Sequence, residues 1–232
     1  MVVTQARAVE TRHTVIAAAA EIFEERGYGN TSLSDVIDRA GVTKGAFYYH
    51  FGTKEALAAA IIEQANNAFG TALDAHLAAP SPMLEKLIQV PFIAVDMMRH
   101  DQLIRVGYAL RMAADHVTLA AGAVLEQRRA TFVGATKTAI AEGDIKGDID
   151  PEELGHTIWA SVTGTQVMAA ASNDNIVTRL AQIWRIILAG TVPPASLPYF
   201  TQFLARVEKQ YAHSPLDAGH EPSQGVHPGA EG

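Results

Sequence analysis

Residues 32–54 read SLSDVIDRAGVTKGAFYYHFGTK, and this stretch decides the fold. Ser32, followed three residues later by Asp35, has the spacing of a capping box at a helix N-terminus. Gly41 can adopt the positive φ at which a helix ends sharply, and Thr43 can then cap a second short helix. The stretch therefore predicts two short helices joined by a tight turn, which is a helix-turn-helix arrangement.

The second of these helices and its flanks carry side chains suited to reading DNA. Three basic residues, Arg39, Lys44 and Lys54, occur without an intervening acid, and polar aromatic residues lie between them. In such motifs the start of the second helix contacts base edges, while cations and hydroxyls contact phosphates. An ordinary helix pair with a solvated basic rim would give the same pattern. The residues expected to contact double-stranded DNA are Arg7, Ser32, Thr43, Lys44, Gly45, Ala46, Tyr48, Tyr49, His50 and Lys54.

The segment from Thr11 to Leu57 resembles the TetR family of transcriptional regulators. The resemblance rests on an ordered series of residues: Ala17-Ala18-Ala19, Ile22-Phe23, Arg26-Gly27-Tyr28, Thr31-Ser32, Gly41-Val42, Lys44-Gly45-Ala46, Tyr48-Tyr49-His50-Phe51 and Lys54-Glu55. It covers the first quarter of the chain and implies a DNA-binding regulator with a three-helix N-terminal unit.

Composition sets limits on the class of protein. The chain has 232 residues, is 48% hydrophobic and carries a net charge of −7. The first 55 residues hold six basic and seven acidic side chains, so DNA affinity must come from positioned contacts in two copies rather than from a broad basic field. The chain has no cysteine, no signal-peptide pattern and no apolar run near the roughly 18 residues of a membrane span. We expect a soluble cytoplasmic protein without a cofactor and with no membrane partner.

Helical periodicity dominates the rest of the chain, and strand alternation is absent from the sequence. The expected fold is all-α: a helix-turn-helix domain over residues 1–53, a larger helical domain for ligand binding and dimerisation over 54–212, and a disordered tail over 213–232. The tail is rich in Pro, Gly and polar residues. Its three histidines are better explained by solvation than by a metal site. Further helices are expected at about 6–26, 54–77, 83–99, 101–114, 119–142, 151–172, 175–189 and 196–211.

The last part of the chain predicts a partner surface. The eighth and ninth helices, near 151–172 and 175–189, are apolar on more than one face, and bulky Ile183, Trp184 and Ile186 surround the ninth. Gly164 within the eighth suggests close backbone approach. We expect a homodimer built as a four-helix bundle across a two-fold axis, although burial inside one monomer would give a similar pattern.

Polar side chains on otherwise apolar helices are candidates for a ligand pocket. Pro91 should kink the helix near 83–99, and a kinked helix often lines a cavity. Each candidate could equally be a satisfied core residue or a surface residue. The residues expected to line the pocket, on the fourth, fifth, seventh and eighth helices, are Gln64, Leu84, Ile88, Phe92, Gln127, Ser161 and Thr165.

Three C-terminal segments, 156–167, 180–184 and 190–193, resemble the γ-butyrolactone autoregulator receptors of actinobacteria. This resemblance implies a small diffusible signal that controls secondary metabolism, and a pocket tryptophan on the seventh helix. The chain has Gln127 at that place, which extends the expected signal to furans and butenolides.

The expected function is a homodimeric repressor that leaves palindromic operator DNA when the signal binds. A second hypothesis is a DNA-binding regulator without a signal of its own. A third is a di-metal bundle enzyme, because Glu10–His13 and Glu153–His156 have the Glu-x-x-His spacing.

Overall fold

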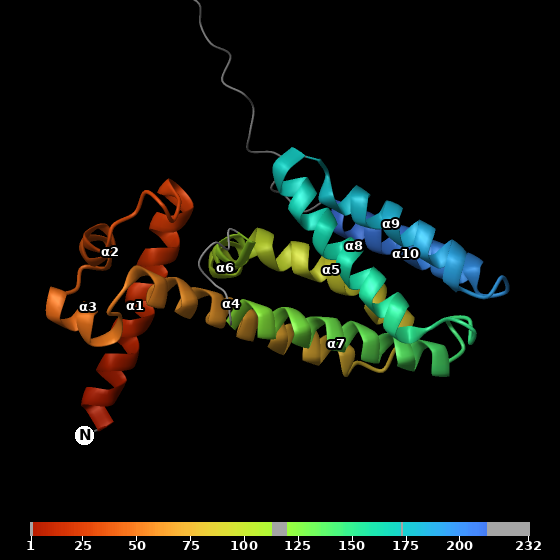
Figure 1. The fold of residues 1–232 in the computed structure, drawn as a ribbon, viewed down its shortest axis with the longest axis horizontal. Coiled ribbons are helices and arrows are strands. Elements are labelled where there is room, and N and C mark those ends of the chain that lie inside the picture. Colours follow the sequence, from red (N-terminus) through yellow and green to blue (C-terminus); the bar gives the residue numbers. More distant parts are fainter. Residues whose placement is uncertain (1, 113–119, 173, 213–232) are drawn as a thin grey trace, which may run out of the picture.

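A computed structural model describes residues 2–112, 120–172 and 174–212 of the chain, and Figure 1 shows the arrangement of its helices. The described residues form helices joined by short connections, without strands. The helices are α1 (Val2–Arg26), α2 (Leu33–Ala40), α3 (Lys44–His50), α4 (Lys54–Leu77), α5 (Met83–His100), α6 (Gln102–Met112), α7 (Ala120–Ala141), α8 (Pro151–Ser172), α9 (Ile176–Thr191) and α10 (Leu197–Ala212). The all-α prediction is confirmed, and α1 begins earlier than the expected residue 6.

Local capping explains where the short helices begin and end. The Ser32 hydroxyl accepts a hydrogen bond from the Asp35 N–H, and the Asp35 carboxylate accepts one from the Ser32 N–H, so the capping box is complete. Gly41 ends α2 with φ = 64°, in the left-handed region that glycine tolerates. Thr43 and Thr53 cap α3 and α4 through their hydroxyls. These caps set where α2, α3 and α4 begin and where α2 ends.

The N-terminal unit has its own hydrophobic core. Phe47 and Phe51 from the α3 region pack with the buried face of α1. The same core takes in the first two turns of α4, residues 57–62, together with Val106 and Leu110 of α6. The expected domain boundary after residue 53 therefore cuts through one packed cluster, because α4 and α6 both contribute apolar side chains to it.

A second core fills the C-terminal unit. Helices α5, α7, α8, α9 and α10 pack around it (Figure 1), with Phe92 and Trp184 among its largest buried side chains. Trp184 thus belongs to the interior of the monomer, whereas the sequence pattern had placed it on a dimer face. Helix α5 runs unbroken from Met83 to His100 through Pro91.

Two glycines mark close helix contacts. A Cβ atom at Gly107 of α6 would lie 2.4 Å from the Cβ atom of Ala65 in α4, and one at Gly155 of α8 would lie 2.6 Å from the Cα atom of Val133 in α7. Gly164, the glycine expected at such a contact, has no heavy atom of a neighbouring element within 4 Å of the position of its Cβ. Within the monomer the close approach is therefore at Gly107 and Gly155.

In the part of the chain that the structure describes, no helix combines the length and apolar character required to cross a bilayer. The predicted loop near residues 115–118 and the predicted disordered tail, with its histidines, lie outside the described residues.

Candidate functional site

Helix α3 presents a polar face to solvent because its apolar residues are used as anchors. Phe47 is fully buried and Phe51 nearly so. Tyr48 and Tyr49 point outward, with 54% and 78% of their surface exposed. Lys44, at the start of the helix, is also exposed. Because the helix is anchored from behind, these side chains are held on a rigid support at one end of the molecule.

The remaining small and polar residues of this region have local roles. The hydroxyls of Ser32 and Thr43 cap α2 and α3. Gly45 has open space around it, so another surface can approach the backbone there. Ala46 is half-buried. His50 is half-buried, with its ring 4.9 Å from that of Tyr49 in an edge-to-face contact.

Two of the three basic residues around α3 are directed into the protein. The Nζ atom of Lys54 donates hydrogen bonds to the carbonyl oxygens of Tyr28, at 2.5 Å, and Thr31, at 2.7 Å. The Arg39 guanidinium pairs with Glu21 and Glu25 on α1. The structure therefore corrects the expectation that Lys54 is available to DNA, because its ammonium group already binds the loop between α1 and α2.

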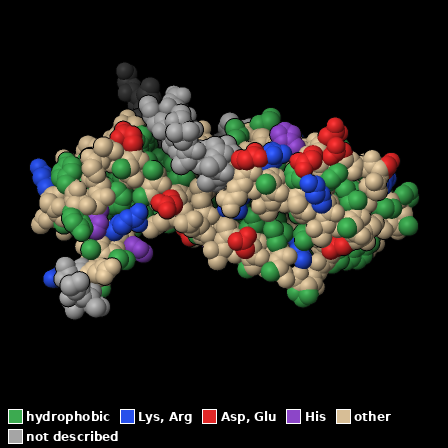
Figure 2. Space-filling view, turned by 60° about the horizontal axis from the view of Figure 1, so that its bottom comes forward, with side chains coloured by type: hydrophobic (Ala, Val, Ile, Leu, Met, Phe, Trp, Pro, Cys, Tyr) green, Lys and Arg blue, Asp and Glu red, His purple; other side chains and the backbone are tan. Residues whose placement is uncertain are grey.

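Exposed basic residues remain at Arg7 and Lys44, and neither forms an ion pair with a described residue. On the face seen in Figure 2, basic and acidic side chains are interspersed, and the acidic ones lie mainly over the C-terminal unit. The surface agrees with the charge count: affinity for an anionic partner must depend on a few positioned groups.

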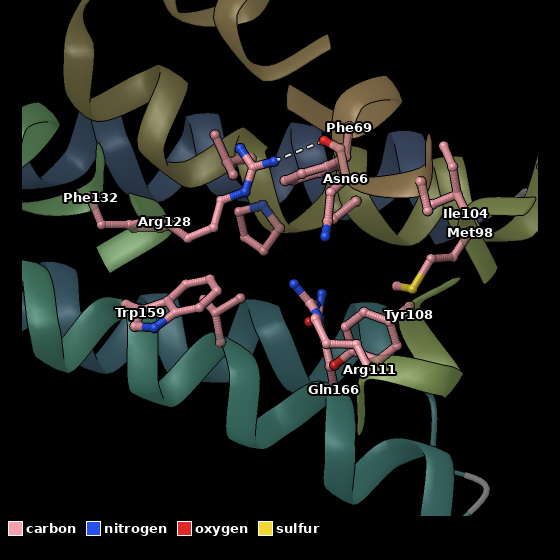
Figure 3. Close-up of a pocket in the computed structure, with 15 residues that line it drawn as sticks. Asn66, Phe69, Met98, Ile104, Tyr108, Arg111, Arg128, Phe132, Trp159 and Gln166 are labelled. Atoms are coloured by element: carbon pink, nitrogen blue, oxygen red, sulfur yellow. Dashed lines mark hydrogen bonds between the residues drawn. The ribbon is translucent and has the colours of Figure 1, made fainter. Parts of the chain in front are cut away.

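A cavity of about 60 Å³ lies between α4, α5, α6, α7 and α8. Figure 3 shows Arg128, Phe132 and Trp159 on one side of it, and Asn66, Tyr108, Arg111 and Gln166 on the other. Its lining residues are Ala65, Asn66, Phe69, Val90, Pro91, Ala94, Met98, Ile104, Tyr108, Arg111, Arg128, Phe132, Trp159, Val162 and Gln166. The four helices expected from sequence all contribute, and α6 adds a fifth wall.

None of the seven expected pocket residues lines this cavity. Leu84, Ile88 and Phe92 are buried in the C-terminal core. The Thr165 hydroxyl donates to the Ser161 carbonyl along α8. Gln64 faces a separate hollow between α1, α4 and α6.

Gln127 is exposed, and its neighbour Arg128 is buried and lines the cavity instead. One residue along a helix turns the side chain by about 100°, so the two adjacent residues face different ways. The tryptophan of this cavity is Trp159 on α8, whose ring lies 5.5 Å from that of Phe132. Sequence reasoning missed Asn66, Tyr108, Arg111, Arg128, Trp159 and Gln166, because periodicity did not show which polar and aromatic residues of these helices face inward.

Several polar atoms in the cavity have no hydrogen-bond partner among the described residues. They are the Asn66 Nδ2, Tyr108 hydroxyl and Arg111 Nε atoms. Burial lowers the pKa of the Arg111 guanidinium and raises that of the Tyr108 hydroxyl. Burial, followed by the charge of Arg111, lowers the pKa of Arg128. Buried polar atoms without hydrogen-bond partners are uncommon in protein cores, and they are found at binding and catalytic sites.

A wider hollow of about 650 Å³ adjoins the cavity and shares Met98, Tyr108 and Gln166 with it. Its other walls come from α5, α6, α8 and the start of α9, and most are apolar. The inner cavity holds the unsatisfied donors, and the wall of the wider hollow also carries the charged residues Arg99, Arg105 and Asp174.

Helix α6 connects this cavity to the N-terminal unit. Ile104, Tyr108 and Arg111 line the cavity, whereas Val106 and Leu110 belong to the N-terminal core. At its start, the Arg105 Nε atom lies 2.5 Å from a Glu24 carboxylate oxygen of α1. This hydrogen bond is the main cause that lowers the pKa of Glu24. A displacement of α6 at the cavity would therefore also change the positions of α1 and α4.

The two Glu-x-x-His motifs do not meet. Glu10–His13 lies on α1 in the N-terminal unit, and Glu153–His156 lies at the far end of the C-terminal unit, at the start of α8 (Figure 1). Across the described ranges, no group of three or more His, Asp or Glu side chains could hold a metal ion.

Two family models match the chain. Residues 15–61 match bacterial regulatory proteins of the tetR family, and residues 81–193 match the tetracyclin repressor-like C-terminal domain. The chain belongs to the TetR family. This TetR-family chain is 30% identical over 201 residues to the A-factor receptor protein of Streptomyces griseus, an alignment covering 84% of this chain and 68% of the receptor. It is also 25% identical over 206 residues to the transcriptional repressor BepR of Brucella suis, covering 84% and 98%.

Solved structures give the same placement for this TetR-family chain. A gamma-butyrolactone receptor described as ArpA-like is 33% identical, with a TM-score of 0.73 over 88% of this chain and 99% of the receptor. CprB of Streptomyces coelicolor, solved with its biological operator sequence, is 33% identical, with a TM-score of 0.70 and the same coverage. The resemblance inferred from the sequence is confirmed.

Proposed function

We propose that this protein is a homodimeric transcriptional repressor that binds palindromic operator DNA and is released by a small diffusible signal. The observation that carries the proposal is that one helix, α6, lines a cavity with unsatisfied polar groups and also packs into the core that supports α3. The A-factor receptor and the gamma-butyrolactone receptors among its relatives support a signal of lactone, butenolide or furan type that controls secondary metabolism.

The DNA-reading half of the proposal rests on α3. Tyr48, Tyr49 and Lys44 are exposed on one anchored helix, and Gly45 allows close approach of its first turn. CprB, of the same fold, was solved on its operator. Tyrosine hydroxyls and a lysine at the start of such a helix can contact phosphates and base edges in the major groove.

Lys44 and Lys54 should respond differently to the same substitution. Lys54→Met removes two charge-assisted hydrogen bonds to buried carbonyls and should lower the free energy of unfolding by about 2 kcal/mol. Lys44→Met should leave stability within about 0.5 kcal/mol, while lowering the salt dependence of DNA binding by about one unit of slope per protomer. Thermal unfolding and operator titration at several salt concentrations measure both. Equal stability of the two variants would contradict the inward role of Lys54.

Dimerisation is assigned to α8 and α9. Met168 on α8 and Ile186 on α9 are 72% and 75% exposed in the monomer, although both are large and apolar. The open space around Gly164 leaves room for the backbone of a second copy. A two-fold axis here would bury these side chains and repeat α3, as a palindromic operator requires.

Ile186→Ala should weaken the dimer. Each copy loses about 1 kcal/mol of apolar burial, and both copies carry the change, so the dimer dissociation constant should rise by roughly 30-fold. Sedimentation or light scattering over a dilution series measures this constant. Val9→Ala, at an exposed aliphatic residue of α1, serves as the control and should not change it.

The signal can shift the DNA-binding equilibrium only if it prefers one of two states of the dimer. The route through this molecule is short: ligand entering the cavity presses on Tyr108 and Arg111, α6 moves, and α4 and α1 follow. Because two recognition helices must keep a fixed spacing of about 34 Å, a small rotation of each N-terminal unit suffices to lose the operator.

A second candidate function is a DNA-binding regulator with no signal of its own, and the cavity volume favours it. Ligand pockets usually hold about 300–1,000 Å³, and the enclosed cavity has about 60 Å³. The adjoining hollow of about 650 Å³ supplies the missing space if Met98, Tyr108 and Gln166 rearrange.

Selection of bound duplexes from a random pool tests the proposal. The protein should recover a two-fold symmetric site, and lactones, butenolides or furans added in turn should include one that releases it. Recovery of a symmetric site that none of them releases would favour the second candidate. Failure to select any duplex would overturn both.

A further inference from the structure

Two arginines share the cavity, and among the described residues neither has a carboxylate partner. Arg111 comes from α6 and Arg128 from α7, and both line the same 60 Å³ space. Among the described residues, Asp74 is the one acid that acts on the charge of Arg128, and its effect is smaller than those of burial and of Arg111. Arg111 has no such acid in the described chain. Two like charges therefore face each other in a largely apolar space.

The described residues hold these guanidinium groups in place without neutralising them. Arg128 donates to the Asn66 carbonyl at 3.1 Å and stacks on Phe69 at 4.7 Å (Figure 3). Gly70 makes room for it, since a Cβ there would lie 3.4 Å from an Arg128 terminal nitrogen. Arg111 lies 5.0 Å from the Tyr108 ring. Burying an uncompensated charge is costly, so a negatively charged ligand group would stabilise these arginines.

The other unsatisfied atoms are also donors. Asn66 Nδ2, the Tyr108 hydroxyl and Arg111 Nε each carry a hydrogen and have no acceptor among the described residues. Figure 3 shows these side chains converging on the space beside Gln166. A carboxylate has about four acceptor positions and takes a guanidinium in a two-point contact. A neutral lactone ring, whose strongest acceptor is one carbonyl oxygen, would leave most of these donors unpaired.

We propose that the signal is an organic acid that binds as its carboxylate between Arg111 and Arg128, with Asn66 and Tyr108 donating to it. This inference rests on the proposed function and specifies the chemical class of its ligand. An apolar chain attached to the carboxylate extends past Met98 into the wider hollow, whose walls include Val95, Met112 and Ile176. The carboxylate draws the two guanidinium groups together, and α6 moves because it carries Arg111.

Binding of matched acids and esters to the full-length dimer tests the charge directly. The probes are 2-hexylfuran-3-carboxylic acid, 4-hexylbenzoic acid, their methyl esters, and a neutral 3-acyl-γ-butyrolactone with a chain of the same length. Calorimetry should give at least one acid that binds on the order of tenfold or more tightly than its ester. An ester or the lactone binding as tightly as its acid counterpart overturns the proposal, and so does the absence of binding by both acids.

Variants of the two arginines locate the site. Arg111→Met and Arg128→Met should each weaken acid binding on the order of 30-fold or more and leave ester binding unchanged. Arg129→Met is the matched control: Arg129 follows Arg128 on α7 but pairs with Glu126 and Glu152 at the surface. The control should bind acid normally. Acid binding that survives both cavity variants overturns the assignment.

Thermal unfolding of the ligand-free variants separates a binding role from a structural one. Arg111→Met removes a charge with no acidic partner and should leave the midpoint of unfolding unchanged or raise it. A fall of that midpoint together with unchanged acid preference would make Arg111 a structural residue and overturn the proposal.

Measurements of operator release distinguish a failure of this inference from a failure of the proposed function. If a neutral lactone releases the operator and no acid does, the repressor function stands and the proposal of a carboxylate signal is overturned. If the protein binds the operator and none of the probes releases it, the proposed carboxylate signal is overturned and the protein remains a DNA-binding regulator.

Discussion

Replacing Gly107 with alanine should destabilise the protein by about 1–2 kcal/mol. The added Cβ would lie 2.4 Å from the Cβ of Ala65 and 3.3 Å from the carbonyl oxygen of Ile61. Neither atom belongs to a flexible side chain, so α6 must move away from α4. Such overpacking costs about 1–3 kcal/mol and occasionally more, which outweighs the gain of about 1 kcal/mol in helix propensity. Thermal unfolding should show a midpoint lower by roughly 2–8 °C.

Gly134→Ala provides the control for that experiment. Gly134 lies inside α7, is exposed, and has no heavy atom of a neighbouring element near the position of its Cβ. There the propensity term acts alone and should stabilise the protein by roughly 0.5–1 kcal/mol. Gly107→Ala should also change operator affinity, because Ala65 lines the cavity and Ile61 belongs to the N-terminal core. Equal stability of the two variants would show that α6 and α4 separate freely.

Tyr48→Ala should reduce operator affinity by a factor between about 30 and 25,000. Each lost contact is worth about 1–3 kcal/mol, and the dimer loses two. Because 54% of Tyr48 is exposed and α3 is anchored by Phe47 and Phe51, the substitution should leave folding and dimerisation unchanged. Fluorescence anisotropy on a selected operator measures the affinity, and circular dichroism checks the helical content.

Tyr199→Ala removes an exposed tyrosine of similar accessibility on α10 and is the control for Tyr48. Its hydroxyl hydrogen-bonds Glu85, so a small stability change is expected, but operator affinity should stay the same. Unchanged affinity of the Tyr48 variant would remove α3 from the DNA interface.

The sequence predicted elements better than it predicted the direction of individual side chains. Caps at Ser32 and Thr43 are local devices that depend on residues three positions apart, and both occur as expected. Lys54 was assigned to DNA because a lysine near a recognition helix is usually exposed. Its partners are carbonyls of Tyr28 and Thr31, more than 20 residues away, and no local pattern indicates them.

The cavity was harder to predict for a related reason. Helix α7 is rich in small and apolar residues around its whole circumference, so its inward face cannot be read from periodicity. Gln127 was chosen as a polar residue on an apolar helix and at the place of an expected tryptophan, whereas Arg128, a charged residue of the kind that usually lies outside, faces inward. The close helix contact at Gly107 and its absence at Gly164 could not be predicted for the same reason. Both glycines lie within helices, and the position of a neighbouring helix decides which of them is closely packed.

The inward use of Arg39 and Lys54 also affects how the protein distributes itself over a chromosome. Nonspecific attachment to DNA depends almost entirely on neutralising phosphates, and a chain of net charge −7 with two of these cations engaged internally offers little of that. A copy that leaves its operator should return to free solution rather than remain on neighbouring duplex. Genomic DNA would then act as a weak reservoir, and operator occupancy would follow the number of free dimers closely.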